Sequence, residues 1–221
     1  MPKVKIPRKS TWVDMTAFCD VAFLLLSFFM LATQFKPDEA AKVETPKSVS
    51  SDTIPTKDAF LVTFDKGGRV FVTYDDVEKK KALFDKLNAD RGIGLTDNEI
   101  RTLNKAMESG IGVPFTMLKS LGSKSKEELQ RVQQPGIPVQ DSVNNELKDW
   151  IATLLAINSG VKPKNVMLKG DNDANYPTFI NVLDAFTKNG IYNFKLITMP
   201  ENAPSGTYLY DARSSGKKDK K

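Results

Sequence analysis

The chain of 221 residues contains no histidine and a single cysteine, Cys19. Without a second thiol no disulfide can form within the chain, and without histidine the commonest general base is missing. The same scarcity leaves no ordinary zinc site, because such sites are built from cysteine and histidine. No Walker sequence, glycine-rich nucleotide loop or nucleophile–base pattern occurs either. We therefore expect a protein that is not an enzyme and that holds no metal and no cofactor.

Long hydrophobic runs are also scarce, and one stretch, residues 15–33, is apolar enough to cross a bilayer. Such a helix rises roughly 28 Å, close to the thickness of the hydrocarbon core. The pattern predicts a membrane-spanning helix over residues 13–35. A cleaved signal peptide is the alternative, since it too has a basic lead and an apolar core. The length of the core and the lack of a small-residue cleavage site before Lys36 favour a permanent anchor.

The charge of the chain is unevenly distributed. Its formal net charge is +5, and residues 1–12 carry four basic residues and no acid, which leaves about +1 for the rest. Basic residues before a span keep that end in the cytoplasm. We therefore expect a cytoplasmic N-terminus over residues 1–12 and a translocated C-terminal domain. A nucleic-acid partner is not expected, because that domain is close to neutral.

Asp20 lies inside the apolar run, where a carboxylate costs roughly 2.5–3.5 kcal/mol on insertion scales. Helical geometry places Thr16 and Ser27 within roughly 40° of Asp20 around the axis. Such a polar stripe turns toward protein or a water-filled cavity, so partner helices are required. The stripe either hydrogen-bonds to a neighbouring helix or handles protons. Because aspartate is a costly hydrogen-bonding group in lipid, we interpret Asp20 as proton-carrying, with Thr16 and Ser27 facing the same pore.

The remainder divides by composition into three parts. Residues 36–58 are polar and proline-containing and predict a flexible linker. Residues 59–200 predict a folded α+β domain with a helical insertion at about 79–140, and residues 201–221 predict a disordered tail. Strands are expected at 59–64, 69–74, 165–169 and 194–198, and helices at 97–109, 114–121, around 147–155 and from 177 to 190. The fold class is therefore a single transmembrane helix plus an α+β domain, with helices on one face of a small mixed sheet.

Asp171, Asp173 and Asn175 have the spacing with which a calcium loop begins. Tyr176 replaces the glycine of such a loop, and Val182 replaces its final glutamate. These replacements exclude an EF-hand. We expect the polar residues to cap the helix that follows them.

The span resembles the membrane motif of the ExbD/TolR family of biopolymer transport proteins. Asp14, Thr16 and the Asp20-Val21 pair, followed by leucines and Phe-Phe-Met at 28–30, follow that motif, with Ala17 in place of the family's proline. Val43-Glu-Thr-Pro46 is similar to the family's stretch after the membrane. Residues 166–171 and 176–198 are similar to its periplasmic domain.

The resemblance implies an ExbD-like subunit of an inner-membrane motor driven by the proton motive force, which energises TonB-dependent transport. It implies Asp20 as the proton carrier, a homodimer inside a ring of ExbB-like channel subunits, and a TonB-like partner that contacts the linker around Val43 and Pro46. A periplasmic C-terminal domain follows from the same resemblance. The alternative within the family is a TolR-like protein that anchors the inner membrane to peptidoglycan. A tethered periplasmic enzyme is the third reading, disfavoured by the absence of a recognisable site.

Overall fold

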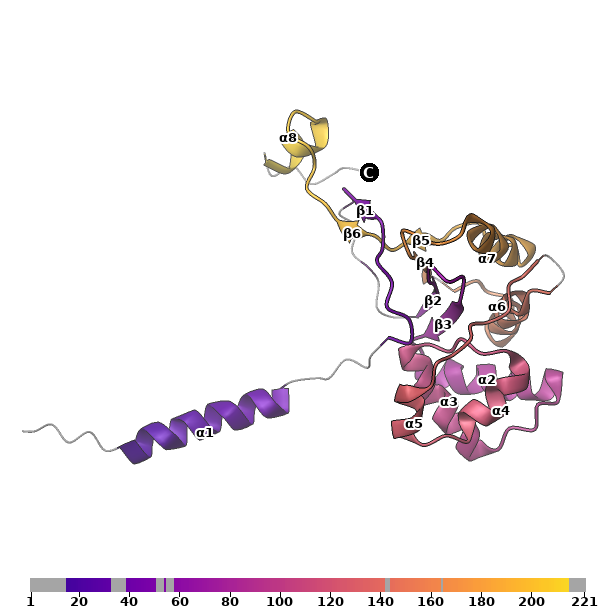
Figure 1. The fold of residues 1–221 in the computed structure, drawn as a ribbon, viewed down its shortest axis with the longest axis horizontal. Helices are drawn as coiled ribbons and strands as arrows, with labels where there is room; N and C mark the ends of the chain where they lie inside the picture. Colours follow the sequence, from indigo (N-terminus) through magenta and orange to yellow (C-terminus); the bar gives the residue numbers. More distant parts are fainter. Residues whose placement is uncertain are drawn as a thin grey trace, which may run out of the picture. The chain divides into compact units, whose positions relative to one another are not determined.

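The computed structural model describes residues 15–32, 39–50, 54, 58–141, 144–163 and 165–214 (Figure 1). The chain divides into two compact units, Met1–Pro37 and Asp38–Lys221. The basic N-terminus predicted over residues 1–12 lies outside the described residues, as do Asp14 and the ends of the predicted span.

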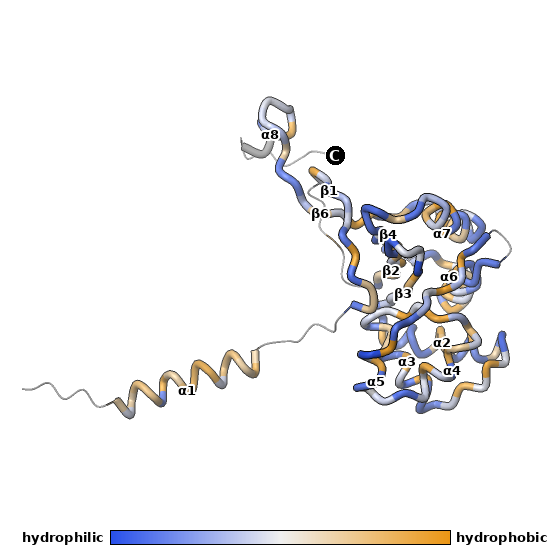
Figure 2. The backbone as a smooth tube through the Cα atoms, in the orientation of Figure 1, coloured by the Kyte–Doolittle hydropathy of each residue, from blue (hydrophilic) through white to orange (hydrophobic). Residues whose placement is uncertain are grey.

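The first unit contains helix α1, Met15–Ala32. None of its residues is buried, and large apolar side chains are exposed on every side, among them Phe18, Phe23, Leu26 and Leu31. Figure 2 shows α1 as hydrophobic along most of its length. Within the described part of the chain, α1 is the one helix long and apolar enough to cross a membrane. The single N-terminal apolar helix of the predicted fold class is confirmed.

The second unit is built on a four-stranded mixed sheet with the strand order β3-β2-β4-β5. Strands β2 (Ala59–Phe64) and β3 (Val70–Tyr74) form an antiparallel hairpin, and β4 (Asn165–Gly170) and β5 (Lys195–Leu196) add in parallel. Asp65 closes the hairpin by accepting hydrogen bonds from the backbone N–H and the Nε of Arg69, at 2.9 and 2.7 Å. Gly68 occupies a left-handed conformation (φ 78°) in this turn, which glycine adopts without strain.

One face of the sheet carries the hydrophobic core. Alternate side chains of the hairpin point into it, and Trp150 of α6 is fully buried there, stacked on Phe115 and edge-on to Phe84. Helices α6 (Glu146–Ile157) and α7 (Tyr176–Lys188) pack on this face together with the inserted helices. The predicted α+β class, a small mixed sheet with helices, is confirmed. The inward residues of the strands are Phe60, Val62, Phe64, Val70, Val72, Tyr74, Val166 and Leu168.

Four helices lie in the segment between β3 and α6: α2 (Val77–Arg91), α3 (Asp97–Ser109), α4 (Phe115–Gly122) and α5 (Lys126–Arg131). They share the core of the sheet rather than forming a separate one. Figure 1 shows them grouped beside β3, whose outer edge is bridged by Ile137 and Ile111 at Val70 and Val72. Helix α2 was not among the expected helices, because its charged sequence hides the apolar side formed by Leu83, Phe84 and Leu87.

Residues 39–48, here called the strap, follow the opposite face of the sheet. The Ala40 N–H donates to the Ser109 carbonyl at 2.8 Å, and the Asn172 N–H donates to the Glu44 carbonyl at 2.7 Å. The strap ends in strand β1 (Lys47–Ser48), which pairs in parallel with β6 (Met199–Pro200). The prediction of a flexible linker over residues 36–58 therefore needs correction for the strap. Backbone hydrogen bonds hold it, and these leave no hydrophobic pattern in the sequence.

The predicted disordered tail also contains structure in its described part, residues 201–214. The Glu201 N–H donates to the Ser48 carbonyl at 2.8 Å, and Ala203 is buried. A short helix, α8, covers Tyr208–Ser214, and Tyr208 is largely exposed. Because β6 pairs with β1, the folded part of the second unit continues past residue 200.

Candidate functional site

Asp20 lies in the second turn of α1, among exposed apolar side chains. At 100° per residue, Thr16 precedes it by one helical turn and Ser27 follows it by about two turns, so the three share one side of the helix. The Ser27 hydroxyl donates to the Leu24 carbonyl at 2.9 Å, which satisfies it within its own helix. Among the three residues, Asp20 is the one with an ionisable side chain. The roles of Thr16, Asp20 and Ser27 in proton transfer remain a prediction.

The strap holds the other two residues singled out from the sequence, Val43 and Pro46. Both are half-buried. The Pro46 carbonyl accepts the Met199 N–H at 2.9 Å. These residues belong to the second unit and Asp20 to the first. Contact of Val43 and Pro46 with a partner stays a prediction.

Contacts on both sides of Val43 tie the strap to the sheet. Ala41 is 5% exposed, and Glu39 forms an ion pair with Lys169 of β4. Glu44 is held twice, because its N–H also donates to an Asp171 carboxylate oxygen at 3.2 Å. The other Asp171 oxygen accepts the Asp173 N–H at 3.0 Å. Asp171 therefore joins the strap to the end of β4 instead of capping α7, and Asn175, at the N-cap position of α7, makes no capping side-chain hydrogen bond.

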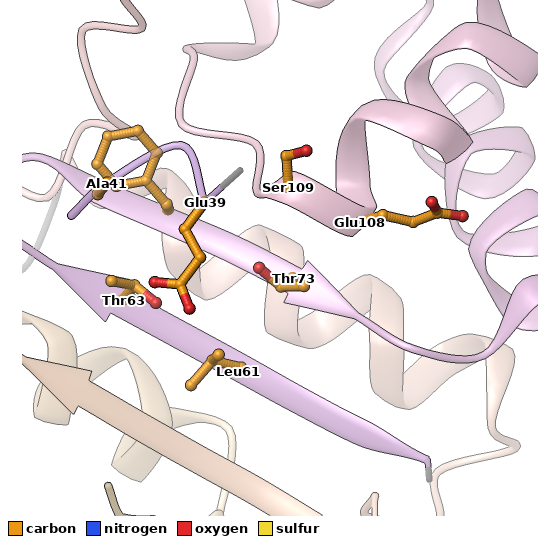
Figure 3. Close-up of a pocket in the computed structure, with 8 residues that line it drawn as sticks. Glu39, Ala41, Leu61, Thr63, Thr73, Glu108 and Ser109 are labelled. Atoms are coloured by element: carbon orange, nitrogen blue, oxygen red, sulfur yellow. The ribbon is translucent and has the colours of Figure 1, made fainter. Parts of the chain in front are cut away.

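A shallow pocket lies beside the strap on the face of the sheet that is remote from the core (Figure 3). In Figure 3 the Glu39 carboxylate lies near Thr63 and Leu61, while Glu108 and Ser109 come from the end of α3. The volume is about 130 Å³, well below the roughly 300–1,000 Å³ of typical small-molecule sites. The pocket does not suit a nutrient-sized ligand. Its lining residues are Glu39, Ala41, Leu61, Thr63, Phe71, Thr73, Glu108 and Ser109.

A second polar group joins the start of β2 to the start of α2. The Tyr74 hydroxyl donates to Asp58 Oδ1 at 3.0 Å, and Lys79 Nζ donates to the same oxygen at 2.9 Å. Lys79 also lies 3.3 Å from an oxygen of Asp76, the N-cap of α2. Burial, reinforced by the hydrogen bond to Asp58, raises the pKa of Tyr74 to about 12. The hydrogen bond to Asp58 also raises the pKa of Lys79.

Sequence reasoning missed this group, here called the Asp58 clamp (Asp58, Tyr74 and Lys79). Asp58 was assigned to the linker and Lys79 to the insertion. One signal was available: strand alternation points Tyr74 into the core, and a buried hydroxyl needs a partner. Which residue supplies that partner depends on the tertiary fold.

No group of three or more histidine, cysteine or acidic side chains within the described ranges is arranged to hold a metal ion. Asp20 and the strap are thus the features that the sequence and the structure both single out. Asp20 offers a carboxyl group on an apolar helix, and the strap offers a segment that backbone hydrogen bonds hold to the sheet.

Comparison with known proteins finds one family whose model spans both features. The model of the family described as "Biopolymer transport protein ExbD/TolR" matches residues 7–96. The match includes α1, the strap, the β2–β3 hairpin and α2, and so extends into the segment predicted as an insertion. It does not include residues 166–198, for which a resemblance was also expected. No curated protein and no solved structure matches the chain significantly. The predicted resemblance is confirmed over residues 7–96, which match the model of the ExbD/TolR family.

Proposed function

We propose that this protein is an ExbD-like subunit of an inner-membrane motor that converts the proton motive force into work on outer-membrane transport. The observation that carries the proposal is Asp20, a single carboxyl group on an otherwise apolar helix within the family match. An ionised acid at such a position is costly unless it has a partner or gains a proton, so an acid kept there is a candidate for a function. Movement of one proton across the membrane supplies roughly 2.3 kcal/mol per 100 mV.

One helix cannot form a proton path, so the proposal requires partner helices. We propose that α1 crosses the inner membrane with its N-terminus in the cytoplasm and that it packs, as one of a pair, within ExbB-like channel subunits. The polar side formed by Thr16, Asp20 and Ser27 then faces the channel, and the apolar sides of α1 contact lipid or partner helices. The second unit lies in the periplasm, where the strap around Val43 and Pro46 contacts a TonB-like protein.

The test is the substitution Asp20→Asn in the full chain. It keeps the size of the side chain and removes its ability to release a proton, so we expect assembly with the channel subunits to persist and energy-dependent uptake to be lost. Thr16→Ala and Ser27→Ala should reduce uptake less. Ala22→Asn is the matched control, because it places the same amide at a similar depth on the other side of the helix, and it should retain uptake.

The measurements are co-purification of the complex and uptake of a scarce nutrient through a TonB-dependent transporter. Normal uptake by the Asp20→Asn protein would refute the proposal. Normal uptake combined with detergent sensitivity of the cells would instead favour a TolR-like role in envelope integrity, with peptidoglycan as the partner of the second unit.

A further inference from the structure

The order of the segments along the chain defines which part of the second unit a displacement of α1 would pull on first. Residues 33–58 provide the covalent connection, and along the chain the strap is met before the Asp58 clamp. The strap's contacts include backbone hydrogen bonds, the two-residue pairing of β1 with β6, and an ion pair in which Glu39 is 59% exposed. Ion pairs with an exposed partner contribute little to stability. Because two-residue pairing and such an ion pair are weak holds, we expect the strap to open more readily than β2.

The clamp differs from the strap because a fully buried side chain takes part in it, although its Asp58 and Lys79 side chains are 30% and 36% exposed. Tyr74 is fully buried, and both bonds to Asp58 involve a charged partner, which roughly doubles the strength of a hydrogen bond. Asp58 also has a left-handed conformation, φ 49°, which is uncommon for residues other than glycine but more accessible to aspartate than to most. The next residue, Ala59, begins β2.

The clamp also joins elements on both sides of the hairpin. Tyr74 is the last residue of β3, Lys79 lies in the first turn of α2, and the Asp75 N–H donates to the Ala59 carbonyl at 3.3 Å. Separation of Asp58 from this position would expose the first pairs of β2, Phe60 with Tyr74 and Ala59 with Asn165. The bonds of Asp58 thus lie at the boundary between the strap and the sheet.

We propose that the Asp58 clamp is a stop that confines opening to the strap, so that displacement of α1 loosens residues 39–48 without unzipping β2. This inference rests on the proposed motor function for the source of the displacement. The stop itself is a property of the folded unit and is measured without a partner or a proton gradient. Asp58 acts here by position and takes no part in proton transfer.

The experiment is amide hydrogen exchange of the full chain in bilayer nanodiscs, for the wild type and three variants. Asp58→Gly removes the carboxylate while allowing the left-handed backbone, and Lys79→Met removes one of the two bonds. The matched control is Lys86→Met, on the same helix, which breaks the exposed Lys86–Asp90 ion pair of 2.9 Å. The amides of Ala40, Met199 and Glu201 report on the strap, and the amides of residues 60–62 report on β2.

In the wild type we expect the strap amides to exchange at least about tenfold faster than those of residues 60–62. Asp58→Gly should raise exchange at residues 60–62 about tenfold or more, and Lys79→Met by a smaller factor. Lys86→Met should leave both sets unchanged. Equal exchange of strap and β2 in the wild type, or a change below twofold at residues 60–62 in both clamp variants, would overturn the proposal. Because these rates do not depend on uptake, normal uptake by the Asp20→Asn protein would refute the motor and leave the stop standing.

Discussion

Helices α1 and α6 are both rich in apolar residues, yet the structure treats them differently. Helix α6 buries Leu147, Trp150, Ile151, Thr153 and Leu154, and its half-buried Glu146 accepts the Phe115 N–H at 2.9 Å. Helix α1 buries nothing within the described part of the chain, and apolar side chains surround it. A helix with an apolar stripe buries it by packing against a sheet, whereas a helix that is apolar all round needs lipid or other helices around it. The difference predicts that the stability of the second unit depends on α6 and that the function depends on α1.

The substitution with the largest expected effect truncates Trp150, the residue that anchors α6 in the core, and so tests this comparison. Trp150→Ala removes the indole ring that stacks on Phe115 at a centroid distance of 5.6 Å. We expect a loss of about 3–5 kcal/mol in the free energy of unfolding of the second unit. Leu24→Ala in α1 should leave that free energy unchanged. Denaturant titration of the full chain in detergent, followed by circular dichroism, measures both, and equal losses in the two variants would contradict the comparison.

An alkaline titration tests the buried polar group of the second unit. The pKa of Tyr74 is about 12 in the folded state, against about 10 for an unperturbed tyrosine. Because the pKa of Tyr74 is higher in the folded than in the unfolded state, the protonated hydroxyl contributes fully to the free energy of unfolding below pH 10. This contribution is lost as the pH rises from 10 to 12. The loss amounts to roughly 3 kcal/mol. Tyr74→Phe should flatten this part of the stability–pH curve measured by denaturant titration, and an identical slope in the two proteins would contradict the assignment.

The smallest expected effect concerns helix ends. The Thr96 hydroxyl accepts the Glu99 N–H at 3.4 Å, and the Glu99 carboxylate accepts the Thr96 N–H at 2.8 Å, which together cap α3. Thr96→Ala should cost about 1 kcal/mol in the free energy of unfolding of the second unit. Thr102→Ala, further along the same helix, is the control and should cost less. A larger loss for the control would show that α3 does not depend on its cap.

Some elements were predictable because their signals are local. The polar cap at Thr96, the apolar spacing after it and Gly110 define α3, and its observed bounds, Asp97–Ser109, are the predicted ones. The hairpin followed from two alternating runs around a turn, and α1 from composition alone. Helix α2 was missed because a run of charged residues at its start conceals the buried Leu83, Phe84 and Leu87.

The sequence by itself determined that one helix suits a membrane, that Asp20 is its costly residue and that an α+β unit follows, because hydrophobic periodicity and helix caps act over a few residues. Only the tertiary structure decided that the strap lies along the sheet and that Asp58 meets Tyr74 and Lys79. The strap contacts join residues that are distant along the chain through backbone groups that every residue possesses, and the Asp58 contacts join side chains from separate elements. Their pairing is therefore set by the folded sheet and not by any local pattern.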